Sequence, residues 1–545
     1  MKMLDAMIEC EPLPPWPANP HVFVFGLDQC NHWQAARNTR KAHFRGSERL
    51  DASGMPVVIR SETVCNVVQR HIPFTLGLLS PAEQQLIKEE GPYTEDYRNI
   101  LYPLEPACVK AQLRQGMAEL MQIISPCTSN VNPPTVREVT AAALARPIQN
   151  LGGPSNISIL PSIPVCDTKS FPDVFKFVPF MLLRCAMTML VMVVNVDGQG
   201  VEILRAAKRR WPDEYRCILI GQGWFHAFCH FMFPINAGYW ECCLCTFAAW
   251  LQKRKQIYKE MNDLENDNAK HILDFHRCVT SAILCCFVLH VQNPPPSLFI
   301  SDPELYASLI QHEGAITIFN YLHNGGSPIL RYQRAIRTGN GKLFKHLAAY
   351  AIHVQRSLSF KPKAVFINFT CLLGLCCAHP KLQTVLENVG CLSLFGDFLM
   401  AYDRFLEYVN WCQQRRNSAF RGYDSQLHFT KYLKPLIHVD AAWKEVDGGG
   451  HGFDDGIPDF LYNDVNVLYQ KLCENLPQDV TIPHVGNTFW FTGNAVPLNG
   501  GDFRERMPWK YVWEVAYGRC KGVGRRAMHW KKCAMTFITY HAFRE

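Results

Sequence analysis

Charged residues are scarce in this sequence: only 19% of the side chains are Asp, Glu, Lys or Arg, and 48% are hydrophobic. With 33 Phe, 19 Tyr and 12 Trp as well, such a chain buries large apolar cores, which excludes an extended disordered polymer. The Gly-x-Ser-x-Gly, His-Glu-x-x-His and phosphate-binding-loop signatures are also missing. The sequence therefore does not support the familiar hydrolase, metalloprotease and kinase chemistries.

An uninterrupted apolar leader is missing too. The segment from Met1 to Pro12 contains acidic residues where a signal peptide has its apolar core. The 23 cysteines are scattered through apolar stretches, as at Cys285–Cys286 and Cys376–Cys377, a pattern typical of buried reduced thiols. We therefore expect an intracellular protein, in the nucleus rather than the cytoplasm.

One apolar run, Phe177 to Val196, is long enough to cross a bilayer. Pro179 and Arg184 interrupt it and Asp197 ends it, and an arginine at the centre of a membrane helix costs about 3 kcal/mol. A buried helix that leads into a central strand explains the run more simply. We expect no membrane partner.

The pattern of strands and helices predicts an α/β fold with a large all-α insertion. Strand, helix and strand follow one another between Leu190 and Ile220, which favours a βαβ unit with parallel strands. Helical periodicity dominates later, and the predicted helices include Ala269–Gln292 and Leu382–Trp411. The expected regions are an N-terminal part of the core at 1–124, a linker at 125–172, a βαβ part of the core at 173–226, an all-helical insertion at 227–439, and a C-terminal helix with a basic aromatic tail at 440–545.

Carboxylates end two of the predicted strands. His21–Asp28 and Leu190–Asp197 are β-prone apolar runs that finish on Asp, and Asp459 and Asp464 lie on a late helix. Two-metal phosphoryl transfer needs hard oxygen ligands, and adjacent strand ends with one helix can bring them together. The alternative is that each strand-end Asp only caps or solvates the following turn.

A second cluster combines imidazoles with thiols, the ligands of tetrahedral zinc sites. It consists of His226, Cys229, His230, Cys242 and Cys245. The spacing is not that of a familiar zinc finger, and thiols on the apolar faces of packed helices are the simpler explanation. We expect no bound zinc.

The last stretch, Phe503 to Cys533, is basic and rich in Trp and Tyr. Cations neutralise phosphates and aromatic rings stack on bases, so this composition predicts DNA as a partner. The alternative is a solvated tail with a few buried aromatic residues, which would have the same composition. The residues expected to contact nucleic acid are Lys510, Arg519, Lys521, Arg525, Arg526, Lys531 and Lys532.

Four motifs in this order resemble a family of eukaryotic mobile elements, the one catalogued as domain of unknown function 6589. Gly26–Asn31 is similar to an early strand that ends in an Asp-Asn type pair, and Val196–Gln199 to a strand followed by Gly-Asp-Gln. Gly221–His226 resembles a Gly-x-x-His segment. Asp459–Asn466 is similar to the late pattern Asp-Leu-x-x-Glu-x-x-Asn.

The resemblance implies an RNase H-like transposase, whose mixed sheet is interrupted by a helical insertion. It implies that Asp28, Asp197 and Asp464 hold Mg²⁺ or Mn²⁺ and that His226 lies near the scissile phosphate. Asn463 stands where the family has Glu, and an amide cannot supply an anionic ligand. Either Asp464 substitutes for that Glu, or the protein is catalytically silent.

Three functional hypotheses follow. The first is a transposon-derived protein of RNase H-like type that binds DNA and cleaves or joins its strands with Mg²⁺. The second is a non-catalytic helical interaction or scaffold protein whose charges lie only on the surface. The third is a zinc-stabilised binding module.

Overall fold

The structure of the chain is a computed structural model. The described residues are 21–33, 49–50, 56–57, 61–72, 80–91, 103–128, 133–145, 157–165, 189–196, 198–213, 215–216, 218–253, 255–257, 269–357, 372, 375–376, 378–393, 399–407 and 457–481. The chain divides into two compact units. The sheet unit consists of Met1–Glu95, Leu151–His226 and Ala378–Phe453, and the helical unit consists of Asp96–Asn150, Ala227–Cys377 and Asp454–Glu545.

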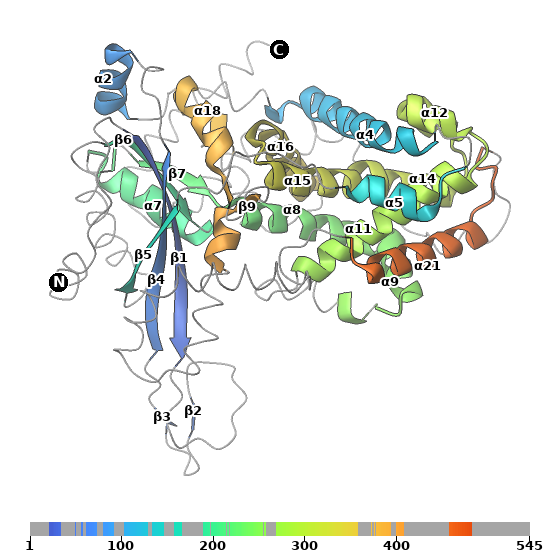
Figure 1. Cartoon of the computed structure of the whole chain (residues 1–545), viewed down its shortest axis with the longest axis horizontal. Helices are drawn as coiled ribbons and strands as arrows, with labels where there is room; N and C mark the ends of the chain where they lie inside the picture. Colours follow the sequence, from blue (N-terminus) through green and yellow to red (C-terminus); the bar gives the residue numbers. More distant parts are fainter. Residues whose placement is uncertain are drawn as a thin grey trace. The chain divides into compact units, whose positions relative to one another are not determined.

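A five-stranded mixed sheet is the centre of the sheet unit (Figure 1). Its strands, in spatial order, are β5 (Ile157–Val165), β4 (Ser61–Ile72), β1 (His21–Trp33), β6 (Met189–Val196) and β7 (Ile218–Gln222). β4 is antiparallel to both β5 and β1, whereas β6 is parallel to β1 and to β7. Residues 191–194 of β6 are almost fully buried, as expected for the apolar run of an inner parallel strand.

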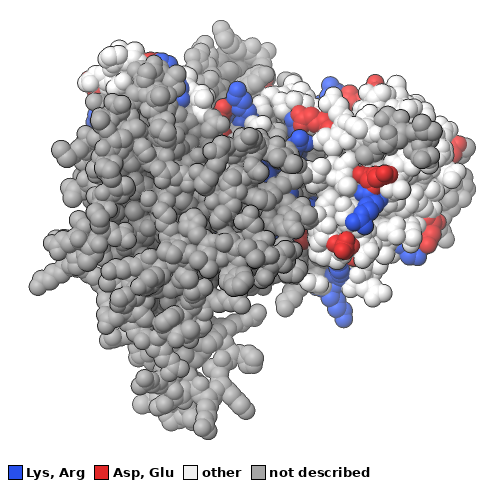
Figure 2. Space-filling view, viewed as in Figure 1, with Lys and Arg blue, Asp and Glu red and all other residues white. Residues whose placement is uncertain are grey.

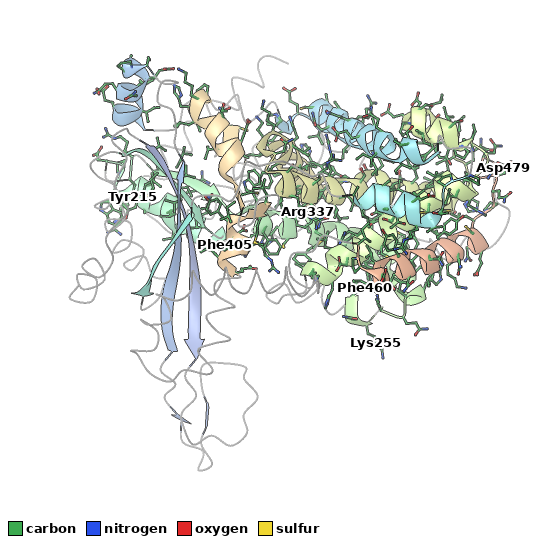
Figure 3. The ribbon with its side chains drawn as sticks, in the orientation of Figure 1. Tyr215, Lys255, Arg337, Phe405, Phe460 and Asp479 are labelled. Atoms are coloured by element: carbon green, nitrogen blue, oxygen red, sulfur yellow. The ribbon has the colours of Figure 1, made fainter. Side chains whose placement is uncertain are left out.

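Helices and two small hairpins complete the described part of the sheet unit. α7 (Gly198–Arg210) links β6 to β7, which confirms the predicted βαβ order. The other elements are the hairpin of β2 (Arg49–Leu50) and β3 (Pro56–Val57), α2 (Pro81–Glu90), α18 (Pro380–Val389), the hairpin of β8 (Cys391–Ser393) and β9 (Leu399–Ala401), and a helical turn at 402–407. Phe405 of this turn, labelled in Figure 3, is fully buried.

The helical unit is a bundle with an aromatic core. Its elements are α4 (Pro106–Thr128), α5 (Val136–Leu144), most of α8 (Trp224–Tyr239), η2 (Trp240–Leu244), α9 (Cys245–Trp250), α11 (Ala269–Cys285), η3 (Cys286–His290), α12 (Pro296–Ser301), α13 (Pro303–Leu309), α14 (Glu313–Tyr321), η4 (Leu322–Gly326), α15 (Ser327–Thr338), α16 (Gly341–Ser357) and α21 (Asp459–Asn475). Phe287 packs against Phe299, Tyr306 and Phe319, with ring centroids 5.5 to 5.9 Å away. On the face shown in Figure 2, acidic and basic side chains are interspersed over the described residues.

The segment Ala269–His290, which joins α11 to η3, is long and apolar enough to cross a membrane by length and composition. In its most apolar stretch, 83% is buried inside the protein, which is the burial of a core helix. Of the run predicted to contain a helix and a strand, the second part forms β6, and residues 177–188 lie outside the described residues. Cys285 and Cys286 are buried free thiols, as predicted.

The predicted fold class, an α/β protein with an RNase H-like sheet interrupted by helices, requires correction. Helix is the main secondary structure of the described residues, and most of it forms a unit of its own. That unit is not one insertion at 227–439, because three separate stretches of the chain build it. The predicted linker at 125–172 contains the end of α4, all of α5 and β5. Helix periodicity alone does not reveal which helices share a core.

Candidate functional site

The carboxyl ends of three neighbouring strands define one edge of the sheet. β1 and β6 are parallel, and their last paired residues are Gly26 and Asn195. Asp28 follows Gly26 by two positions, and its backbone is opposite Asn66 of β4. The prediction that the strand ends at Asp28 is wrong, because β1 stays paired with β4 as far as Trp33. Asp197, two positions after Asn195, lies outside the described residues. In sheets with parallel strands, binding sites form at this carboxyl edge.

The first turn of α8 begins beside the same edge. β7 ends at Gln222, and the backbone N–H of Gly223 donates to the carbonyl of Val196, the last residue of β6, at 3.1 Å. α8 then starts at Trp224, so His226 lies in its first turn. The predicted motif Gly221–His226 is therefore a turn from strand to helix.

Asp403, from the helical turn at 402–407, caps α8 from a distant part of the sequence. Its Oδ2 accepts from the backbone N–H of His226 at 2.7 Å, and its Oδ1 accepts from that of Phe225 at 3.2 Å. These N–H groups have no partner within the helix, and a carboxylate at a helix N-terminus is favoured by the helix dipole. Only 8% of the Asp403 side chain is exposed, so this is a buried cap.

Two glycines make this arrangement possible. A Cβ atom on Gly223 would collide with the carboxylate of Asp403, and one on Gly390 would collide with the ring of Trp224. Gly390 directly follows α18, so its contact with Trp224 brings the stretch that contains Asp403 against the start of α8. No larger residue fits at either position without displacing the site.

His226 is held between two carboxylates. Its Nδ1 lies 2.9 Å from Oδ2 of Asp403, and its Nε2 lies 3.5 Å from Oε1 of Glu407. Only an imidazolium donates from both ring nitrogens, so this geometry suits the protonated ring. Both the His226 and Glu407 side chains are 32% exposed, which leaves the site open to a ligand.

Glu407 is shared with Arg404, whose Nη1 lies 2.9 Å from Oε2. The Arg404 guanidinium also stacks over the ring of Phe225 at 4.9 Å. Burial raises the pKa of the Glu407 carboxyl, and the positive charges of His226 and Arg404 act in the opposite direction. The site is therefore a chain of alternating charges built on the first turn of α8.

The remaining predicted acids belong to the helical unit. Asp464 lies on α21 in the helical unit, where its carboxylate forms an ion pair with Lys253. Asn463 is exposed. Asp459 is also exposed, at the first turn of α21.

Sequence reasoning missed Asp403 and Glu407, although a signal was present. The segment Asp403-Arg-Phe-Leu-Glu407-Tyr-Val-Asn410 has Asp, Glu and Asn at the spacing of the late pattern Asp-Leu-x-x-Glu-x-x-Asn. It keeps the Glu that Asn463 replaces in the predicted segment. The segment lies within the long helix predicted over Leu382–Trp411 and was therefore not considered as a separate motif. Only its contacts with His226 indicate that it belongs to the site.

The thiols of the predicted zinc cluster have packing partners. Cys229 and Cys242 are buried in the helical unit, and Sγ of Cys242 lies 3.4 Å from the carbonyl oxygen of Tyr239. Within the described ranges, no group of three or more His, Cys, Asp or Glu side chains is arranged to hold a metal ion. The side chains of Asp28 and Asp197 are not among those described.

The basic tail lies outside the described residues. This applies to all seven predicted nucleic-acid contacts, Lys510, Arg519, Lys521, Arg525, Arg526, Lys531 and Lys532. No protein-family profile, curated protein or solved structure matches the chain. The proposal for its function must therefore come from its own residues and from the motif resemblance.

Proposed function

We propose that this chain is a transposon-derived protein that binds DNA and cleaves or joins its strands in a Mg²⁺- or Mn²⁺-dependent reaction. The observation that carries the proposal is the parallel pairing of β1 with β6, in which Gly26 is opposite Asn195. Asp28 and Asp197 each follow by two positions. Asp28 is thus a residue of β1 and Asp197 directly follows β6 in the sequence, and carboxylates are the hard oxygen ligands that divalent cations prefer.

The third carboxylate of the proposed site is Glu407, in place of Asp464. Glu407 belongs to the same unit as Asp28, whereas Asp464 is in the other unit and is paired with Lys253. Burial disfavours the charged form of Glu407, as its raised pKa indicates, and a cation near this group would offset that cost. Three carboxylates in one unit would supply the hard oxygen donors that a divalent cation prefers.

The chain's own residues would position the reacting groups. A divalent cation at this edge would polarise the scissile phosphate and lower the pKa of a bound water. Asp403 fixes the ring of His226 through Nδ1, and the ring in turn holds Glu407 through Nε2. His226 is accordingly a positioning residue as well as a nearby positive charge for a phosphate. DNA would be retained by the basic aromatic tail, whose cations suit phosphate contacts.

Metal-dependent nicking of end-labelled duplex DNA by the purified full chain tests this proposal. We expect Asp28→Asn/Asp197→Asn to lose nicking by about a hundredfold or more, because outer-shell changes alone cost about 10- to 100-fold at metal sites. Glu407→Gln is expected to lose activity to a similar degree. Asp464→Asn is the matched control, because it removes one carboxylate from the other unit, and it should retain activity.

Each outcome has a definite meaning. If Asp464→Asn loses nicking activity and Glu407→Gln keeps it, the third metal ligand is Asp464 and not Glu407. Nicking that is independent of Asp28 and Asp197 would refute the proposed metal site. A wild-type chain that binds DNA in a salt-sensitive manner without nicking, in either metal, would reduce the function to DNA binding.

A further inference from the structure

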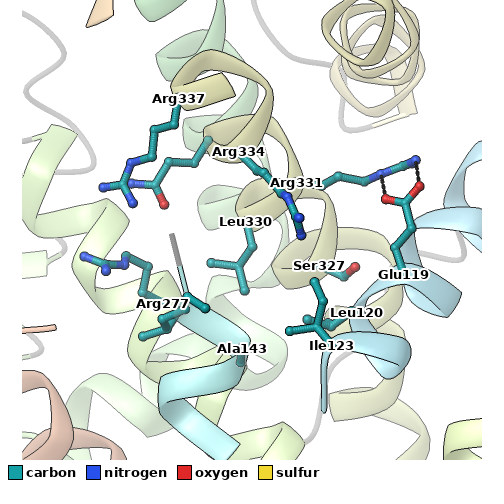
Figure 4. A pocket seen from close by; sticks show the side chains of 14 residues that line it. Glu119, Leu120, Ile123, Ala143, Arg277, Ser327, Leu330, Arg331, Arg334 and Arg337 are labelled. Atoms are coloured by element: carbon teal, nitrogen blue, oxygen red, sulfur yellow. Dashed lines mark hydrogen bonds and ion pairs between the residues drawn. The ribbon is translucent and has the colours of Figure 1, made fainter. Parts of the chain in front are cut away.

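A hollow in the helical unit is ringed by arginines (Figure 4). Residues of α4, α5, α11 and α15 line it. Its charged lining residues are four arginines and a single glutamate: Arg277, Arg331, Arg334, Arg337 and Glu119. On the face drawn in Figure 2, by contrast, the described residues mix the two signs.

The glutamate is fully engaged by one of these arginines. Nε and Nη2 of Arg331 each lie 3.0 Å from a different carboxylate oxygen of Glu119, and Nη1 donates to the carbonyl of Gln112 at 2.6 Å. This two-pronged pair satisfies Arg331 and neutralises Glu119. Beside this pair, the lining holds three more arginines and no further acidic residue.

Arg277 of α11 has a donor without an acceptor. Its side chain is 9% exposed, and its Nη1 lies 3.0 Å from Oδ1 of Asp274. Its Nε is buried and has no hydrogen-bond partner among the described residues. An unsatisfied buried donor on a charged group is costly, so its presence beside a hollow points to an acceptor that binds there.

Arg334 and Arg337 approach the hollow from α15. They are three positions apart, as are Arg331 and Arg334, so the three arginines follow one face of the helix. Arg334 is exposed and Arg337 is half-buried. Figure 4 shows Arg277 on one side of the hollow and the arginines of α15 on the other.

We propose that this hollow binds a phosphate group between Arg277, Arg334 and Arg337. A phosphate monoester carries close to two negative charges and several acceptor oxygens, which suits three guanidinium groups better than a single carboxylate does. Ser327, which also lines the hollow, adds a hydroxyl donor. The phosphate is either a backbone phosphate of nucleic acid or part of a small phosphorylated compound. This phosphate site does not depend on the strand cleavage proposed above.

The test uses the full chain and two probes, inorganic pyrophosphate and a short random-sequence DNA duplex. The variant Arg334→Gln/Arg337→Gln leaves Arg277–Asp274 and Arg331–Glu119 intact. The matched control, Lys270→Gln/Lys342→Gln, removes the same charge from two exposed lysines of α11 and α16 in the same unit. The single variant Arg334→Gln changes only an exposed side chain and is expected to fold normally. It therefore keeps the test valid if the double variant misfolds.

For pyrophosphate, we expect calorimetric affinity to fall about tenfold or more in the double arginine variant and by a smaller factor in Arg334→Gln. The lysine control should stay within about twofold of wild type. If the source is nucleic acid, DNA affinity also falls and the slope of log affinity against log salt decreases by about two in the arginine variant. If only pyrophosphate binding falls, the source is a small phosphorylated compound.

The proposal is overturned if neither probe binds more weakly to the arginine variants than to the lysine control. The nicking assay tests residues of the sheet unit, whereas the binding assay tests residues of the helical unit. If the protein does not nick DNA but still binds pyrophosphate through Arg334 and Arg337, only the proposed function is disproved. The converse result, nicking without arginine-dependent binding, disproves only the phosphate site.

Discussion

The two units hold histidines in opposite surroundings. His226 in the sheet unit has a carboxylate facing each ring nitrogen and is partly open to solvent. In the helical unit, burial lowers the pKa of His276 to about 3 and that of His353 to about 4. Each of these core rings bonds a neutral oxygen, the Tyr321 hydroxyl at 2.7 Å and the Leu104 carbonyl at 2.8 Å respectively.

The difference separates a polar site from a structural core. A histidine that is to hold or move charge needs ionised partners and access to solvent. A histidine that fills a core is kept neutral by desolvation and needs only one good hydrogen bond. We therefore expect changes in the buried core of the helical unit to alter mainly its stability, and changes around His226 to alter the geometry of the site.

The largest stability effect should come from the aromatic core of the helical unit. Phe287→Ala is expected to lower the free energy of unfolding by about 3–5 kcal/mol, because it leaves a cavity among Phe299, Tyr306 and Phe319. This change is measured by urea unfolding that is monitored through hydrogen exchange in peptides of the helical unit. Exchange resolved by peptide also separates the two units, which need not unfold together.

The matched control for Phe287→Ala is Phe460→Ala on α21. The Phe460 side chain is 50% exposed (Figure 3), so removing its ring should cost much less. Equal losses in the two variants would mean that apolar burial does not dominate the stability of this unit.

Acid should destabilise the helical unit through its buried histidines. The pKa of His276 is depressed in the folded state, so the unfolded chain takes up a proton near pH 6.5 and the folded chain does so only near pH 3. Stability is thus fully present above about pH 6.5 and falls as the pH decreases toward 3. Between pH 7 and pH 5 the loss from His276 is about 2 kcal/mol.

Urea unfolding of wild type and His276→Asn across this pH range tests the assignment. The variant should be less stable at pH 7, because Asn leaves the space of the ring unfilled, but its stability should decline less steeply toward pH 5. An unchanged slope would show that His276 is not the group responsible. His353 should contribute a similar decline that ends nearer pH 4.

In the sheet unit we expect a smaller effect from Asp403→Asn, about 1–2 kcal/mol. The amide keeps one acceptor oxygen for the start of α8 but loses the charge that faces the helix N-terminus and His226. Asp213→Asn in the same unit is the control, because that carboxylate is 82% exposed and should matter little. Gly223→Ala should resemble Asp403→Asn, since its Cβ would displace the same carboxylate.

The elements that sequence reasoning identified correctly are those with strong local patterns. The apolar runs before Asp28 and Asp197 predicted β1 and β6, although β1 continues beyond Asp28 to Trp33. The helix predicted over Ala269–Gln292 is observed as Ala269–His290. In β6 and in Ala269–His290 the pattern of buried residues is encoded within the segment itself. Nothing beyond neighbouring residues was required.

The elements that it missed depend on contacts between distant parts of the chain. The single helix predicted over Leu382–Trp411 is interrupted, because α18 gives way at Gly390 to the hairpin of β8 and β9. Gly390 accommodates the ring of Trp224, and Asp403 caps α8 from 177 positions away. Periodicity carries no information about such partners, and so the carboxylates beside His226 were overlooked in favour of Asp464.

The smallest stability effect should come from that predicted ligand. Asp464 is 22% exposed and Lys253 is 37% exposed, and ion pairs in such positions contribute about 0–1 kcal/mol. Asp464→Asn should therefore lower the free energy of unfolding by less than about 1 kcal/mol, and added salt should shrink the difference further. Urea unfolding at low and high salt measures both quantities. A loss of several kcal/mol would mean that the Lys253–Asp464 pair helps to hold α21 in the helical unit, a role that its partial exposure argues against.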